Sequence, residues 1–160
     1  GAYIGKTRIE GKGPKVQYRK IKNDSEEAIE IGKHIESLVT SDVPLNEIAI
    51  LSPVRYEKSN IRNIESRWKK HIENISVDNI CTKHQKSILF SNIRDFKGLE
   101  RKYILIIDTD LLPKDNNLFK SFLYVGMTRA QINLWIAMRV KFEKIKNDLI
   151  LARYQNEKKK

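Results

Sequence analysis

The chain has 160 residues, which suits one domain with a hydrophobic core of its own. Its formal net charge of +11 favours a polyanionic partner, nucleic acid first, over the alternative that excess lysine only keeps the domain soluble. One cysteine excludes an internal disulfide, and no apolar run is long enough to cross a bilayer or to act as a signal peptide. We therefore expect a soluble, cytoplasmic protein without a membrane partner.

Residues 1–14 are rich in glycine and lysine, and we expect them to form a flexible N-terminal segment. Their opening letters, GAYIGKT, approach the phosphate-binding pattern G-x-x-x-x-G-K-[ST], but the spacing between the two glycines is one residue too short. The glycines and the proline that follow also resist the helix that such a loop requires. The segment is therefore not interpreted as a P-loop.

Strands and helices alternate along residues 15–140. Apolar patterns predict strands at residues 16–21, 47–51, 77–81, 88–93, 102–110 and 132–138, and helices at 25–40, 58–71 and 119–130. Because several strands are apolar on both faces, we expect a three-layer α/β domain whose mostly parallel sheet is covered by helices on both faces. Residues 141–160 are predicted to form a lysine-rich C-terminal helix and tail.

The segments NIRDFKGLE (residues 92–100) and FLYVGMTRA (residues 122–130) each precede an apolar strand. In sequence and order they resemble motifs V and VI of the UvrD/Rep-like superfamily 1 helicases, and EIAILSPVR (residues 47–55) resembles the strand that carries motif IV. The resemblance covers residues 16–138 and implies a RecA-like fold: the second, C-terminal motor domain of a DNA helicase or translocase. The FKGLE form and the short stretch before it are similar to compact members that lack a large inserted domain.

The resemblance implies that some residues face a nucleotide. Glu100 corresponds to the glutamate that binds the ribose, and Gly98 lets the backbone approach a ligand closely. Arg129 corresponds to an arginine finger that reaches the γ-phosphate of ATP and stabilises charge in the transition state. Without the resemblance, the preferred interpretation of Glu100 is a solvated loop acid or a partner of Arg101, because a lone carboxylate is weak evidence of a ligand site.

Two aspartates follow the apolar strand at residues 102–110 and offer another interpretation of Arg129. Asp108 and Asp110 imitate a Walker B acid pair, but without a P-loop we interpret them as loop caps or as ion-pair partners of Arg129. Arg55 is the candidate for a second γ-phosphate arginine. In the family the motif IV arginine stands at the position that Pro53 occupies here, and Arg55 lies two residues later. Arg55 contacts the γ-phosphate only if it takes the place of that arginine despite the offset.

The resemblance also implies a nucleic-acid-facing set. Asn92 and Arg94 stand where the commoner form of the family has threonine and histidine in contact with the nucleic-acid backbone. Asparagine can donate a hydrogen bond and arginine can pair with phosphate, although a solvated surface cation is an equal interpretation of Arg94. Lys97 and Thr128 complete the expected nucleic-acid set.

The chain has no Walker A or Walker B motif of its own, so it would carry only half of a composite ATP site. ATP and Mg²⁺ are expected only together with the first RecA-like domain of the same parent protein, and the isolated chain is predicted to be monomeric and inactive as an ATPase. Cys81 and His84 have C-x-x-H spacing, but nothing nearby completes a zinc ligand set, so no metal is expected. The alternative function is a non-catalytic module with a RecA-like fold that binds nucleic acid or protein.

Overall fold

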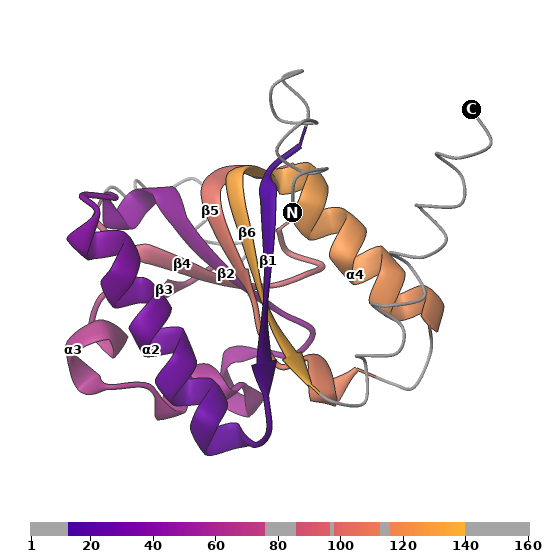
Figure 1. Ribbon diagram of the computed structural model, residues 1–160, viewed down its shortest axis with the longest axis horizontal. Coiled ribbons are helices and arrows are strands. Elements are labelled where there is room, and N and C mark those ends of the chain that lie inside the picture. Colours follow the sequence, from indigo (N-terminus) through magenta and orange to yellow (C-terminus); the bar gives the residue numbers. More distant parts are fainter. Residues whose placement is uncertain (1–12, 76–85, 97, 113–115, 140–160) are drawn as a thin grey trace.

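The computed structural model describes residues 13–75, 86–96, 98–112 and 116–139 of the chain. They form one sheet of six strands in the order β1-β6-β5-β2-β4-β3, and every neighbouring pair is parallel (Figure 1). The strands are β1 (Lys15–Ile21), β2 (Ile48–Ser52), β3 (Ile72–Asn74), β4 (Ile88–Asn92), β5 (Arg101–Ile106) and β6 (Ala130–Arg139). The α-helices are α2 (Asp24–Thr40), α3 (Ser66–Lys69) and α4 (Asn116–Arg129), and the short 3-10 helices are η1 (Leu45–Glu47), η2 (Tyr56–Lys58), η3 (Asn60–Asn63) and η4 (Thr109–Leu111).

Helices α2 and α4 lie on opposite faces of the sheet (Figure 1). Helix α2 begins after Asn23, whose side chain accepts a hydrogen bond from the Glu26 N–H at 2.8 Å, and acidic residues in its first turn favour the positive end of the helix dipole. It buries Ile31 and Ile35 against one face of the sheet, whereas α4 buries Phe119 and Phe122 against the other. The predicted three-layer α/β fold is confirmed.

Strand β2 shows why the sheet needs two covering layers. All its residues are buried, and they alternate between the two sides: Ile48 and Ile50 join the core under α2, and Ala49 and Leu51 join the core under α4. A strand that is apolar on both faces loses its hydrophobic stabilisation if either layer is missing.

No helix of the described ranges has the length and apolar character needed to cross a membrane.

The helix predicted at residues 58–71 is wrong. The chain there forms η2, η3 and the four-residue α3. The Ser59 hydroxyl accepts a hydrogen bond from the Ile61 N–H and donates one to Asp108, so it competes with the regular helical hydrogen bonds. Strand β3 was not predicted, and the strand predicted at residues 77–81 lies outside the described residues.

The parallel arrangement gives the sheet two unlike edges. At the edge called here the amino edge, the strands begin; at the opposite, carboxyl edge, they end. Figure 1 shows β1 running from the amino edge at the top to the carboxyl edge at the bottom. Residues just before a strand therefore lie far from residues just after its neighbour.

Candidate functional site

The amino edge brings Glu100 and Arg129 to the starts of two neighbouring strands. Arg129 is the last residue of α4, and β6 begins at the next residue, Ala130, without an intervening loop. Ala130 pairs with Arg101, the first residue of β5, and the Gln131 side-chain N–H donates to the Glu100 carboxylate at 3.0 Å. Two residues predicted to face a nucleotide thus share one edge.

Arg129 is half-buried, and its side chain forms no ion pair or hydrogen bond with the residues that the structure describes. The alternative ion pair with Asp108 or Asp110 does not form, because both aspartates follow β5 and lie at the carboxyl edge. Thr128 lies beside Arg129 and its hydroxyl donates to the Val125 carbonyl at 3.1 Å. Thr128 is therefore at the opposite edge from Asn92 and Arg94, two of the other residues predicted to contact nucleic acid.

Gly98 and Arg101 form the neighbouring part of the amino edge. Gly98 has a φ of +80°, a backbone conformation that residues with a side chain rarely adopt, and the Leu99 N–H donates to the Phe96 carbonyl across this turn at 3.2 Å. The Arg101 side chain donates to the backbone oxygen of Glu100 at 2.9 Å, so the carboxylate itself is not its partner. Arg101 Nε is buried without a hydrogen bond among the described residues, and burial lowers the pKa of this guanidinium.

Gly126 sets how closely α4 approaches the sheet. A Cβ atom at this position would lie 2.6 Å from Ile106 Cδ1 and 3.0 Å from Leu134 Cδ1. The glycine of YVGMTRA therefore allows the helix to pack directly on β5 and β6. The close packing positions the end of α4, and with it Arg129, at the amino edge.

The carboxyl edge holds Asn92, Arg94 and Arg55. The Asn92 side-chain oxygen accepts hydrogen bonds from the Arg94 and Asp95 N–H groups at 2.9 and 3.1 Å, which forms a tight turn after β4. Ser52, at the end of β2, pairs with Asn92, and Arg55 follows three residues later. The structure thus places Arg55 at the same edge of the sheet as Asn92 and Arg94, and at the opposite edge from Glu100 and Arg129. Lys97 lies outside the described residues.

A buried polar network at the same edge was not predicted. Asp108 accepts hydrogen bonds from the Ser52 hydroxyl at 2.6 Å, from the Ser59 hydroxyl and from the Asn60 N–H at 3.0 Å. Its own N–H donates to Glu27 at 2.7 Å. Asp108 therefore holds the loop after β2, which agrees with its interpretation as a loop cap.

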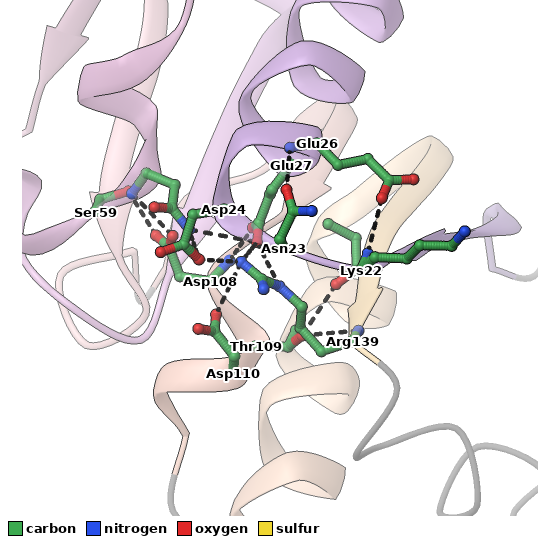
Figure 2. Close-up of polar contacts among 12 residues, drawn as sticks. Lys22, Asn23, Asp24, Glu26, Glu27, Ser59, Asp108, Thr109, Asp110 and Arg139 are labelled. Carbon is green, nitrogen blue, oxygen red and sulfur yellow. Dashed lines mark hydrogen bonds and ion pairs between the residues drawn. The ribbon is translucent and has the colours of Figure 1, made fainter.

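Arg139 is the cation of this network (Figure 2). Its guanidinium donates to Glu27 from Nε at 2.9 Å, pairs with Asp24, and lies 3.6 Å from Asp110. Oxygens of Asp24, Glu27 and Asp110 lie within 4.8 Å of one another, as in some metal sites, but the guanidinium already occupies the position of the cation. The arrangement is a salt-bridge network that joins α2, η4 and the end of β6.

Burial governs the electrostatics of the network. It raises the pKa of Glu27 to about 7, although hydrogen bonds from the Asp108 backbone and from Arg139 lower it. It likewise raises the pKa of Asp108, against the hydrogen bonds from the two serines. The sequence could have indicated that Glu27 is buried, because it stands four residues before Ile31 and so lies on the apolar face of α2.

Comparisons with known proteins agree with this architecture. A family model described as "UvrD-like helicase C-terminal domain" matches residues 87–137, which contain β4, β5, α4 and β6. The fold is similar to the crystal structure of the C-terminal domain of a possible DNA helicase from Lactobacillus plantarum WCFS1, with a TM-score of 0.57 and 13% sequence identity, covering 82% of this chain and 80% of that one. No curated protein matches the chain significantly. The structural similarity, at this identity, supports the RecA-like fold.

Proposed function

We propose that this chain, whose residues 87–137 match the family model of the UvrD-like helicase C-terminal domain, is the second motor domain of an ATP-dependent superfamily 1 DNA helicase or translocase. In this proposal it is one domain of a longer protein. It supplies half of a composite ATP site from its amino edge and part of a track for single-stranded DNA from its carboxyl edge.

The observation that carries the proposal is that the Arg129 side chain is half-buried and has no partner among the described residues. A half-buried guanidinium at the end of an apolar helix is costly unless it has a partner. The buried, unpartnered Nε of Arg101 lies at the start of the adjoining strand. Both features fit an anionic ligand that approaches the amino edge from another domain.

The roles at the amino edge follow from the chemistry of each group. Glu100, an exposed carboxylate, accepts a hydrogen bond from the ribose, and Gly98 leaves room for the backbone to approach the nucleotide. Arg129 stabilises the charge that develops on the γ-phosphate, as an arginine finger does. The P-loop and the Mg²⁺ ligands come from the first RecA-like domain of the same protein, so the isolated chain does not hydrolyse ATP.

The track for single-stranded DNA lies along the carboxyl edge. Arg94 is exposed in the turn that the Asn92 side chain holds together, and its guanidinium is available for a phosphate. Opening and closing of the ATP cleft at one edge would move DNA along the other. In this arrangement Thr128 does not contact the DNA, because it lies at the amino edge.

The experiment is single-strand-stimulated ATP hydrolysis by the full-length protein that carries this chain, with Arg129→Ala beside wild type. Loss of an arginine finger is expected to lower kcat by about 10³–10⁵. The matched control is Arg67→Ala, which removes an exposed arginine paired with Glu36 and Glu65, and it should leave the rate unchanged. Equal rates for Arg129→Ala and wild type would remove the finger assignment.

A second function is favoured by the position of Arg55. Its place at the carboxyl edge leaves the nucleotide edge without the second arginine expected from motif IV. A RecA-like module that binds nucleic acid without driving a motor would account for this arrangement. Absence of ATP hydrolysis by the wild-type full-length protein, together with retained DNA binding, would support that alternative.

A further inference from the structure

We propose that Gln131 is a positioning residue for the nucleotide. It holds the Glu100 carboxylate so that one oxygen is left for the ribose hydroxyls, and it thereby makes the site prefer ribonucleoside triphosphates over their deoxy counterparts. The inference rests on the proposed function and deepens it, because it adds a residue outside the segments NIRDFKGLE and FLYVGMTRA and states which substrates the amino edge distinguishes.

The hydrogen bond from Gln131 leaves one carboxylate oxygen of Glu100 available. The Gln131 side-chain N–H donates to Glu100 Oε2 at 3.0 Å, whereas Oε1 accepts no hydrogen bond from the residues that the structure describes. An ionised carboxylate only accepts hydrogen bonds, and each hydroxyl of a ribose can donate one. The available oxygen therefore matches a group that ATP presents and a deoxy analogue lacks at one position.

The partner of the Glu100 carboxylate is a neutral amide, so the negative charge is not compensated by a cation. Arg101, the neighbouring cation, donates to the backbone oxygen of Glu100 at 2.9 Å and forms no ion pair within the described ranges. Hydrogen bonds to an ionised acceptor are stronger than those between neutral groups, and an uncompensated carboxylate is the better acceptor for a hydroxyl. Gln131 thus orients this acceptor without neutralising it.

An irregularity in the sheet accompanies this contact at the start of β5 and β6. Ala130 pairs with Arg101, and the next recorded pair joins Asn133 to Tyr103, so β6 has one more residue than β5 along this stretch. Such a bulge bends its strand and re-aims a side chain, and bulges are common beside active sites. The extra residue lies in the segment that contains Gln131, directly after the end of α4.

Holding the Glu100 side chain before the nucleotide arrives should strengthen nucleotide binding. Glu100 and Gln131 are both exposed, and an exposed glutamate without a partner samples several rotamers. Ordering such a side chain during binding costs conformational entropy, and a side chain that is already held avoids much of that cost. The benefit is expected in affinity rather than in the chemical step, because a ribose contact is equally strong in the ground state and in the transition state.

The test is hydrolysis of ATP, 2′-deoxy-ATP and 3′-deoxy-ATP by the full-length protein that carries this chain, at saturating oligo(dT). Gln131→Met keeps the length of the side chain and removes its N–H donor. It should raise KM for ATP, leave kcat unchanged and lower the preference for ATP over the poorer deoxy substrate by about threefold to tenfold. Glu100→Ala should abolish this preference, and adding Gln131→Met to it should cause no further change, since Gln131 acts through Glu100.

The matched control is Gln17→Met on β1, because Gln17 is also an exposed glutamine and accepts a hydrogen bond from the Asn133 side chain at 3.1 Å. This variant should keep the wild-type KM and the wild-type preference for ATP. An equal effect of Gln17→Met and Gln131→Met would mean that any change of this kind disturbs the edge, and the inference would be overturned.

The outcomes separate this inference from the proposed function. If wild type hydrolyses ATP and Gln131→Met keeps the full preference, or if Gln131→Met still has its effect in the Glu100→Ala background, the inference fails and the proposed function stands. The same holds if wild type hydrolyses ATP and both deoxy substrates equally well. Absence of hydrolysis by wild type would contradict the proposed function itself, and the inference with it.

Discussion

Replacing His34 with phenylalanine should remove an acid-sensitive element from the core. His34 stacks on Trp135 with ring centroids 4.9 Å apart and planes 12° apart, and among the described residues its Nε2 is buried without a hydrogen-bond partner. Burial lowers the pKa of this imidazole from 6.5 to about 4. Phenylalanine supplies another aromatic ring that can stack on Trp135, and this ring cannot be protonated.

The sign and size of the effect follow from proton linkage. The folded state keeps His34 neutral, whereas the unfolded chain takes up a proton below its ordinary pKa of 6.5. The contribution of His34 to stability is therefore complete above pH 6.5 and is lost as the pH falls toward 4. For a pKa of 6.5 unfolded and about 4 folded, the loss is about 2 kcal/mol at pH 5 and about 3 kcal/mol at pH 4.

The assay is urea denaturation of wild type, His34→Phe and the control His71→Gln at pH values between about 4 and 7.5. Glu27, with its raised pKa, gives stability an opposite pH dependence, but its contribution is shared and cancels in the difference between variant and wild type. The free energy of unfolding of His34→Phe relative to wild type should rise by about 2 kcal/mol from pH 7 to pH 5. A difference that does not depend on pH would refute the reasoning.

Three other substitutions test the packing and the polar network. Gly126→Ala should lower the free energy of unfolding by about 1 kcal/mol, because its Cβ atom displaces the ends of the Ile106 and Leu134 side chains and the gain in helix propensity offsets only part of that cost. The bulkier Gly126→Val should lower it by about 3 kcal/mol, and chemical denaturation of both variants checks the order. Arg139→Ala should lower the free energy of unfolding by about 3–5 kcal/mol, since Glu27 is left buried without its cation. If the double variant Arg139→Ala with Glu27→Gln regains part of this stability, that part is due to the lost charge pairing and the remainder to lost packing. Gly98→Ala should cost about 1 kcal/mol from backbone strain alone, because no atom lies within 4 Å of the added methyl group; a loss several times larger would contradict this account of the turn.

Sequence patterns predicted the layers of the fold because the signals are local. The apolar runs of β2 and β5 show that both faces are buried, and the apolar spacing of α2 shows one buried face. The helix predicted at residues 58–71 failed because the decisive contact is remote in sequence. Asp108 accepts hydrogen bonds from Ser59 and Asn60, which lie 49 and 48 residues before it in the sequence. No local pattern around Ser59 predicts these contacts.

The candidate site was predictable in part. Glu100 and Arg129 were identified from their motifs, and the structure adds that they lie at the same edge. The location of Arg55 follows from strand polarity, since a residue after a strand lies at the carboxyl edge and a residue before the neighbouring parallel strand lies at the amino edge. The pairing of Glu27 with Arg139 joins residues 112 positions apart, which no local spacing could predict.

The central claim is that the nucleotide binds at the amino edge of the sheet and single-stranded DNA binds at the carboxyl edge. The most direct measurement is ATP hydrolysis by the full-length protein as a function of oligo(dT) concentration, for Arg129→Ala and for Arg94→Ala. We predict that Arg129→Ala lowers kcat and leaves the DNA concentration for half-maximal stimulation unchanged, whereas Arg94→Ala raises that concentration and retains kcat at saturating DNA. If both changes shift the same parameter together, the separation of the two edges is contradicted.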